Sequence, residues 1–269
     1  MQGSSTWHPP GGTLGRILDE TRRRLPSIEG RRPPPSNQPR PSFRMALKRP
    51  KVAVIGELKR RSPSKGTLNN ALNAGQSVLI ERGGAAAISV LTEPEFFGGS
   101  VDDLIAVRAA VRLPLLKKDF HIDVSQLLEA RFANASAVLL IARALPPAEL
   151  KRMMDAAKGL DLETLIEVRS DEELEHALEA GAEVIGVNSR DLETLHVDDT
   201  VPERLIPKIP PHLIAVWESG IRNVADVRRA ADCGADAVLV GSALSKAEDV
   251  PKLVAELASV PRETRHGRD

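Results

Sequence analysis

Eight short apolar runs constrain the fold of this chain more than any other feature of its sequence. The runs are rich in Val, Ile, Leu and Ala, and lie at residues 52–57, 85–91, 113–118, 136–142, 163–168, 183–188, 213–218 and 236–241. Each run is too short for a buried helix, and none shows the polar alternation of a half-exposed antiparallel strand. We therefore predict parallel strands that are buried on both faces.

Amphipathic segments with helical spacing separate these runs. They lie at residues 76–84, 101–111, 124–133, 147–158, 170–181, 223–234 and, more weakly, 201–209, and another follows the last run at 249–260. Small residues join several helices to the next strand, and a glycine there fits the left-handed conformation in which helices often end. Eight strand–helix units in about 210 residues predict a closed (β/α)8 TIM barrel, an α/β fold. An open doubly wound sheet is the alternative, but no G-x-G-x-x-G motif follows the first run.

The first 50 residues depart from this pattern. Residues 13–25 have apolar side chains at helical spacing and predict an N-terminal extra helix, and a proline-rich stretch at 31–43 predicts an extended linker. Three consecutive arginines at 22–24 are interpreted as a solvated helix face rather than an RNA contact. We divide the chain into a disordered tail at 1–12, the N-terminal helix and linker at 13–50, the barrel at 51–260 and a C-terminal tail at 261–269.

Composition excludes several classes of function. The chain has 269 residues, with 37 Lys and Arg against 37 Asp and Glu, and only 3% of its residues are aromatic. Zero net charge and few stacking side chains argue against a nucleic-acid partner. The single cysteine, Cys233, cannot form an internal disulfide, and the six histidines lack metal-ligand spacing, so we expect no metal site and a cytoplasmic location. We also expect no membrane span and no secretory signal.

Polar residues end five of the eight runs, where a barrel of this kind carries its chemistry. These residues are Glu57 and Lys59, Lys117 and Lys118, Glu167, Asn188, and Glu218. A spacing of two puts Glu57 and Lys59 on one face, whereas only one of the two adjacent lysines can face the lumen. By the same alternation, Trp217 should point away from the lumen. Such residues can simply solvate the rim, but five strands ending this way favour a shared site with perturbed pKa values.

A second group of residues fits a phosphate. Ser219 and Gly220 follow the seventh run, and Gly241 and Ser242 follow the eighth. Glycines at these positions free backbone N–H groups for an anion, although each could also be an ordinary turn residue. Ser62, in the loop after the first run, could add a hydroxyl.

Seven motifs occur in one order along the chain. They are 57–66 (ELKRRSPSKG), 89–94 (SVLTEP), 97–100 (FGGS), 116–120 (LKKDF), 166–168 (IEV), 186–192 (GVNSRDL) and 218–221 (ESGI). Together they resemble the indole-3-glycerol-phosphate synthase family, over residues 13–260. The resemblance implies a cofactor-free lyase of tryptophan biosynthesis. Its substrate would be 1-(2-carboxyphenylamino)-1-deoxyribulose 5-phosphate, and its products indole-3-glycerol phosphate, carbon dioxide and water.

The resemblance also implies roles for individual residues. Lys118 matches the general acid and Glu167 the general base, while Lys59 and Glu57 match a second acid/base pair whose share of the steps stays open. The remaining matches are Asn188 and Glu218 for orientation, Ser62, Ser219, Gly220, Gly241 and Ser242 for the phosphate, and Phe97, Phe120 and Leu139 for the ring pocket. The sequence departs from the family pattern at His121, Arg169 and Trp217.

Alternative functions remain open at this point. A different phosphate-binding barrel, such as a phosphoribosyl isomerase, would share the glycines but would not need the two lysines with Glu57 and Glu167. A degenerate barrel that only binds a sugar phosphate would lack turnover. We expect a monomer or a weak homo-oligomer with a small phosphorylated substrate as its partner.

Overall fold

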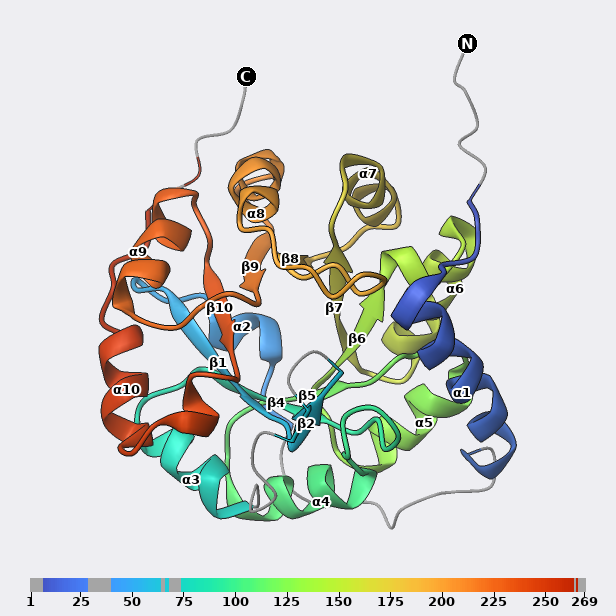
Figure 1. Cartoon of the computed structure of the whole chain (residues 1–269), viewed down its shortest axis with the longest axis horizontal. Coiled ribbons are helices and arrows are strands. Elements are labelled where there is room, and N and C mark those ends of the chain that lie inside the picture. Colours follow the sequence, from blue (N-terminus) through green and yellow to red (C-terminus); the bar gives the residue numbers. More distant parts are fainter. Residues whose placement is uncertain (1–6, 29–39, 64–65, 68–73, 264, 266–269) are drawn as a thin grey trace.

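The eight apolar runs form the parallel strands of a closed barrel in the computed structural model of the chain (Figure 1). The structure describes residues 7–28, 40–63, 66–67, 74–263 and 265. The barrel strands are β1 (Ala53–Leu58), β4 (Ala87–Leu91), β5 (Leu115–Lys118), β6 (Ala137–Ile141), β7 (Glu163–Val168), β8 (Val184–Asn188), β9 (Ile214–Glu218) and β10 (Ala237–Val240). Strands consecutive in this series pair with each other, and β10 pairs with β1, which closes the ring. The prediction of a (β/α)8 TIM barrel is confirmed.

Helices surround the barrel on its outside (Figure 1). They are α3 (Ala74–Arg82), α4 (Val101–Ala110), α5 (Val124–Phe132), α6 (Pro147–Gly159), α7 (Asp171–Glu179), α8 (Thr200–Leu205), α9 (Val224–Asp232) and α10 (Val250–Leu257), with short 3-10 turns η1 (Ala142–Ala144), η2 (Ile206–Lys208) and η3 (Leu244–Lys246). Gly84, Asn134, Gly181 and Gly234, which follow α3, α5, α7 and α9, all have positive φ. The small residues predicted at these junctions therefore do end helices in the left-handed conformation.

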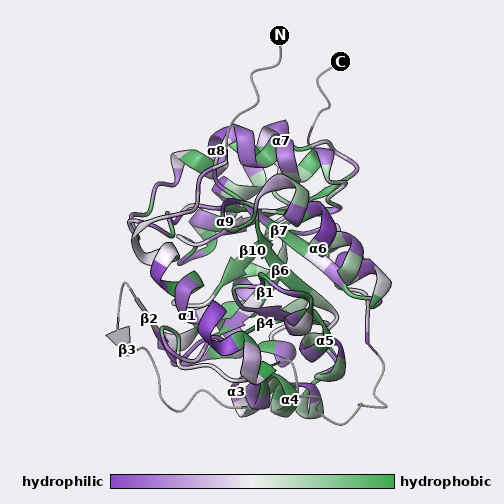
Figure 2. Ribbon diagram, turned by 90° about the vertical axis from the view of Figure 1, so that its right-hand side faces the viewer, coloured by the Kyte–Doolittle hydropathy of each residue, from purple (hydrophilic) through white to green (hydrophobic). Residues whose placement is uncertain are grey.

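Apolar side chains form two layers, because successive residues of a strand point to opposite faces. The lumen contains residues such as Ile55, Leu116, Leu165 and Val216, whereas the alternate residues of the strands pack outward against the helices. Trp217 is fully buried in the outer layer, as predicted. Figure 2 shows mostly hydrophobic strands inside, surrounded by helices in which hydrophilic and hydrophobic residues alternate.

The N-terminal segment packs against both ends of the barrel. Helix α1 (Gly12–Ile28) lies at the C-terminal ends of the strands, where the N–H of Thr13 donates to the carbonyl of Glu193 (2.9 Å), in the loop after β8. Helix α2 (Phe43–Leu47) lies at the opposite end. There Ser42 Oγ donates to Glu163 Oε1 (2.6 Å), at the first residue of β7, and Phe43 is fully buried in the lumen core.

Besides α2, two parts of the chain were not anticipated from the sequence. After β1 the chain forms a small antiparallel pair, β2 (Arg61–Ser62) and β3 (Gly66–Thr67), before it reaches α3. Near the C-terminus, Arg262 and Arg265 both contact the carboxylate of Asp236, each at 2.7 Å. No helix in the described ranges is long and apolar enough to cross a membrane.

Candidate active site

A cavity of about 530 Å³ opens at the C-terminal ends of the strands. It is lined by twelve of the residues singled out from the sequence: Glu57, Lys59, Phe97, Lys118, Phe120, Leu139, Glu167, Asn188, Ser219, Gly220, Gly241 and Ser242. Glu218 is buried directly beside them and contacts Lys118. Ser62 belongs to β2, but its side chain lies outside the described part of the structure. Residues that are up to 185 positions apart (57 to 242) thus meet around one cavity.

Lys118 is the cation at the centre of the site. It ends β5, and its ammonium group forms an ion pair with Glu218 Oε2 from β9 and lies 3.8 Å from Glu167 Oε2 of β7. Burial alone would lower the pKa of Lys118, but the charges of Glu218, Glu167 and Glu57 outweigh it and raise the pKa above its usual range. Lys118 is therefore protonated at neutral pH and held in place.

Glu167 is a buried carboxylate whose environment favours the protonated form. Burial and the neighbouring charge of Glu218 raise its pKa to about 7, while Lys118 and a hydrogen bond from Asn188 act in the opposite direction. That bond runs from Asn188 Nδ2 to Glu167 Oε1 (3.0 Å), and Asn188 Oδ1 in turn accepts from the N–H of Arg190 (2.9 Å). A carboxyl group that titrates near neutrality is suited to taking up and releasing protons.

Glu57 and Lys59 lie on one face at the end of β1 and form an ion pair. Burial raises the pKa of Glu57, but the charges of Lys59 and Lys118 outweigh burial, so its pKa lies below the usual value. Glu57 is thus ionised at neutral pH, whereas Glu167 titrates near neutrality. These two carboxylates differ because Glu57 is bonded to a lysine, whereas Glu167 is bonded to an amide and lies near the charge of Glu218.

The loops after β9 and β10 bring the backbone itself to the cavity wall. Ser219 and Gly220 both have positive φ (65° and 82°), a turn that costs little at glycine and is uncommon at serine. Gly241 lies against the ion pair of Glu57 and Lys59, because a Cβ at this position would overlap Glu57 Oε1 and lie 3.1 Å from Lys59 Nζ. These loops can therefore present backbone groups to a ligand next to the charged side chains.

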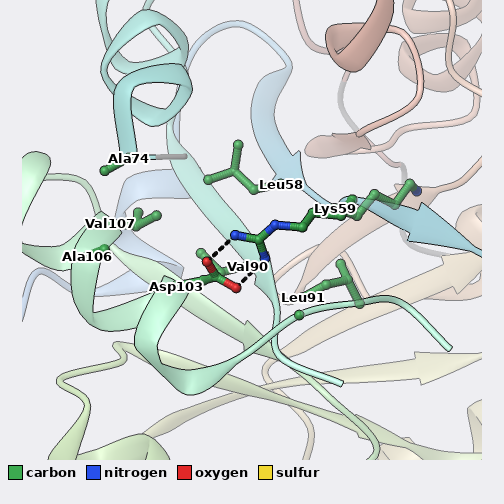
Figure 3. Close-up of a pocket in the computed structure, with 10 residues that line it drawn as sticks. Leu58, Lys59, Ala74, Val90, Leu91, Asp103, Ala106 and Val107 are labelled. Atoms are coloured by element: carbon green, nitrogen blue, oxygen red, sulfur yellow. Dashed lines mark hydrogen bonds and ion pairs between the residues drawn. The ribbon is translucent and has the colours of Figure 1, made fainter. Parts of the chain in front are cut away.

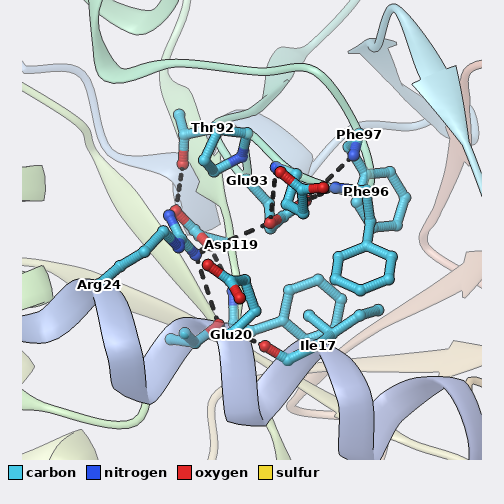
Figure 4. A network of polar contacts seen from close by, with 12 residues as sticks. Ile17, Glu20, Arg24, Thr92, Glu93, Phe96, Phe97 and Asp119 are labelled. Atoms are coloured by element: carbon cyan, nitrogen blue, oxygen red, sulfur yellow. Dashed lines mark hydrogen bonds and ion pairs between the residues drawn. The ribbon is translucent and has the colours of Figure 1, made fainter.

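Two phenylalanines form an aromatic wall of the cavity. The rings of Phe97 and Phe120 are 6.0 Å apart between centroids and inclined by 34°. Glu93 fixes the loop that carries Phe97, since its carboxylate accepts from the N–H groups of Glu95, Phe96 and Phe97 at 2.7–3.0 Å. Figure 4 shows this arrangement beside α1.

Asp119 fixes the second ring in a similar way. Its Oδ1 accepts from the N–H of Phe120 (2.9 Å), and its Oδ2 accepts from Thr92 Oγ1 (2.7 Å). Arg24 of α1 approaches both buried carboxylates, at 3.6 Å from Asp119 Oδ1 and 3.9 Å from Glu93 Oε1 (Figure 4). The sequence suggested that Arg24 belongs to a solvated face, but its side chain is largely buried and faces these loops.

Lys117, the neighbour of Lys118, points away from the cavity. Its ammonium group is fully buried and lies 3.2 Å from Asp119 Oδ2, 3.3 Å from Glu129 Oε2 and 3.3 Å from His121 Nε2. Burial and the charge of Lys117 lower the pKa of His121 to about 3, so the imidazole is neutral and its Nδ1–H donates to the carbonyl of Leu139 (2.7 Å). One lysine faces the lumen and the other the outer layer, as predicted.

Several residues of the cavity had no role assigned from the sequence, among them Asp119 and Arg222. Arg190 lies two positions after Asn188, and this spacing would have indicated the same face. Burial lowers its pKa, which the charge of Glu57 partly offsets. Ile17 reaches the cavity from α1 and Asp199 from the loop before α8, and no local pattern points to either.

A smaller cavity of about 120 Å³ lies between β1, β4 and α4. Figure 3 shows its lining residues, with Lys59 extending away from Asp103 and Val107. Most of this lining is apolar, and its charged members include Arg60 and Asp103, which form an ion pair with each other. Among the residues that the structure describes, no three His, Cys, Asp or Glu side chains are grouped so that they could hold a metal ion.

Similar folds occur among solved structures. Thiamine phosphate pyrophosphorylase from Pyrococcus furiosus superposes with a TM-score of 0.59 at 21% identity, covering 77% of this chain and 94% of that chain. The N-acetylmannosamine-6-phosphate 2-epimerase of Clostridium perfringens gives a TM-score of 0.57 at 18% identity, covering 73% and 89%. At these identities the likeness concerns the fold alone.

Sequence comparisons are more specific. Residues 17–257 match the family model described as indole-3-glycerol phosphate synthase. The chain is 44% identical over 243 residues to the protein of that name from Mycolicibacterium smegmatis, covering 90% of this chain and 86% of the relative. It is 47% identical over 226 residues to indole-3-glycerol phosphate synthase 1 of Streptomyces coelicolor, covering 83% and 84%. The chain therefore belongs to the indole-3-glycerol phosphate synthase family.

Proposed function

We propose that this protein converts 1-(2-carboxyphenylamino)-1-deoxyribulose 5-phosphate into indole-3-glycerol phosphate, carbon dioxide and water. Membership of the family supports the synthase activity. The observation that carries the residue assignments is the meeting of Lys118 with Glu167 and Glu218 at the wall of one cavity. Cyclisation needs a proton donor beside a carbonyl, and dehydration needs a base that can release its proton again.

In the first step, the ring carbon that bears the carboxylate attacks the ketone carbon of the sugar arm. A carbon–carbon bond forms, and the electron pair of the carbonyl moves to its oxygen. Lys118 donates a proton to this oxygen, and its charge stabilises the developing alkoxide. The ion pair with Glu218 and the proximity of Glu167 support this role, because they keep the ammonium group protonated and in one position.

In the second step, the carbon–carbon bond to the carboxylate breaks, and carbon dioxide leaves. Its bonding electrons return to the ring system. In the third step, the hydroxyl group leaves as water after protonation, and Glu167 removes the proton whose loss completes the indole. A pKa of about 7 suits Glu167 to this role. Lys59, which is paired with Glu57 at the same wall, is a second acid for the departing hydroxyl.

Substrate binding divides into three regions of the cavity. We assign the phosphate to Ser62 and to the backbone of the loops at Ser219, Gly220, Gly241 and Ser242. Phe97, Phe120 and Leu139 contact the aromatic ring, with Asn188 and Glu218 orienting the groups around it. Arg190 supplies a further cation for the substrate carboxylate, since it lines the same cavity close enough to Glu57 to affect its charge. Fixing a flexible sugar arm against the ring removes much of the entropic barrier to cyclisation.

The direct test is an assay of the purified protein with the synthetic substrate and without added metal or cofactor. We expect the ultraviolet absorbance and fluorescence of an indole to appear, with one carbon dioxide released per indole. A folded protein that forms no indole, yet binds the substrate, would indicate a sugar-phosphate binding protein instead. Release of carbon dioxide without indole would indicate that the reaction stops after the second step, and would contradict the roles proposed for Lys59 and Glu167 in dehydration.

A further inference from the structure

We propose that Arg229 is a positioning residue that neutralises the carboxylate of Asp199 at the edge of the phosphate site. The inference rests on the proposed function, because it takes the Ser219–Gly220 turn as part of the phosphate site. Neither residue belongs to the charged group around Lys118, and neither was singled out from the sequence. Together they explain how an anion can bind in the cavity beside a carboxylate.

Asp199 places a carboxylate against the backbone that we assign to phosphate. It lines the main cavity together with Ser219 and Gly220. Its Oδ1 packs so closely on Gly220 that a Cβ at this glycine would lie 2.6 Å from it. Within the described residues, this buried oxygen has no hydrogen-bond partner. An ionised carboxylate in this position repels a phosphate unless a cation compensates its charge.

Arg229 of α9 provides that cation. Its guanidinium group lies 2.8 Å from Asp199 Oδ2 and is further surrounded by Glu203 at 3.7 Å and Asp226 at 3.8 Å. The group also lies over the ring of Trp217, 5.3 Å from its centroid. Cation–π contact with a buried ring and a charge-assisted hydrogen bond together fix the guanidinium group in one place.

Trp217 connects this pair to the loop that follows β9. Its Nε1–H donates to Ser189 Oγ (2.9 Å) and to the carbonyl of Ser219 (3.1 Å), the residue before Gly220. Arg229 does not itself line the cavity. It therefore acts on a bound phosphate through Asp199: the arginine cancels the charge of Asp199, and the carboxylate keeps its packing against the turn.

The test is a double-mutant cycle of four proteins: wild type, Asp199→Asn, Arg229→Met and the double variant. Each is measured for kcat, for KM and for the inhibition constant of inorganic phosphate as a competitor. We expect phosphate to bind most tightly to Asp199→Asn, where the carboxylate charge beside Gly220 is removed and Arg229 keeps its own. Wild type and the double variant should be similar, and Arg229→Met should bind about tenfold more weakly than wild type. The kcat should change by less than about threefold throughout, because the charged group around Lys118 is untouched.

Arg228→Met is the matched control, because it removes the same charge from an exposed position on the same helix. It should leave the inhibition constant within about twofold of wild type. Restored phosphate binding in the double variant distinguishes charge compensation from a structural role, which a second substitution would not repair. If Arg229→Met does not fold, the tighter binding expected of Asp199→Asn still tests the inference.

Affinities that do not follow the net charge of the pair would overturn the inference while leaving the proposed function intact. The same holds if Arg229→Met and Arg228→Met behave alike. Wild-type protein that neither turns over the substrate nor is inhibited by phosphate would contradict the proposed function itself, and the inference with it.

Discussion

Lys117 and Lys118 are neighbours in sequence, yet they lie in two different electrostatic regions of the barrel. Lys118 faces the lumen and a cavity of about 530 Å³, and its side chain retains 13% exposure. Lys117 faces the outer layer with 0% exposure, among Asp119, Glu129 and His121. Both are paired with carboxylates, so an ion pair by itself does not distinguish a catalytic lysine from a structural one.

The two regions differ in what their carboxylates do. Around Lys117, Asp119 accepts hydrogen bonds from Thr92 and from backbone, and burial is outweighed by nearby cations that hold its pKa below the usual range. Around Lys118, Glu167 has a raised pKa, and Glu218 Oε1 has no hydrogen-bond partner among the described residues. A substrate in the cavity can supply the hydrogen bond that Glu218 Oε1 lacks, whereas the carboxylates around Lys117 already have their partners within the protein.

Removal of the lumen lysine is expected to have the largest effect. Lys118→Ala should lower kcat by about 10²–10⁴-fold, because the proton donor and the charge that stabilises the alkoxide are both lost. Competitive inhibition by inorganic phosphate should change little, since the phosphate loops are separate from the lysine. The assay is steady-state indole formation, with the circular dichroism spectrum as a check of folding. Turnover within tenfold of wild type would remove Lys118 from the mechanism.

Removal of the outer lysine should act mainly on stability. Lys117→Met leaves Asp119 and Glu129 buried without their shared cation, which should lower the free energy of unfolding by about 3–5 kcal/mol. Urea denaturation measures this change. The kcat of the folded fraction should stay within about fivefold of wild type, because Lys117 faces away from the cavity. A loss of kcat as large as that of Lys118→Ala would show that the two regions are not separate.

The pH dependence of kcat/KM distinguishes the regions through their titrating groups. Glu167, with a pKa of about 7, must be ionised to act as a base, so kcat/KM should fall about tenfold per pH unit below pH 7. His121 cannot produce this limb, because its pKa of about 3 keeps it neutral throughout the range. The variant His121→Gln should therefore retain the limb. Its disappearance in that variant would assign the titration to the outer region.

The smallest expected effect is on the free energy of unfolding, through the titration of Glu167 in the lumen. The folded state raises the pKa of Glu167 from an ordinary 4.5 to about 7, so folding favours its protonated form. Stability is therefore lost as pH rises from 4.5 through 7, and Glu167→Gln should remove this loss. We expect the free energy of unfolding of the variant to exceed that of wild type by about 1–2 kcal/mol at pH 8 and to differ little at pH 4.5. A destabilised variant at pH 8 would mean that the ionised carboxylate is well accommodated.

Periodicity was sufficient to predict the barrel, because strands buried on both faces leave continuous apolar runs and the helices between them end at small residues. The site was partly predictable for the same reason, since residues at strand ends converge when the ring closes. The alternation of β5 indicated that one lysine enters the lumen, but not which one. That choice depends on the pairing of β5 with β4 and β6, which no local pattern encodes.

The N-terminal helix and several loop residues of the cavity were predicted, but other contacts made by the loops and by the N-terminal segment were not. Arg24 looked like part of a solvated face because its partners, Glu93 and Asp119, are distant in sequence. Asp199 meets Gly220 only because two βα loops fold over the same mouth. Helix α2 follows a proline-rich stretch, and its burial depends on Glu163, which is more than a hundred residues away.

Helix α1 is attached at both ends to the rim of the barrel. Near its start, the N–H groups of Gly11 and Thr13 bind Glu193 in the loop after β8, and near its end Arg24 approaches Glu93 in the loop after β4. In the ring order, β8 and β4 are diametrically opposed. A widening of the rim that moves these two loops apart would therefore break one of these attachments. Amide hydrogen exchange along α1 would then report the frequency with which the enzyme opens.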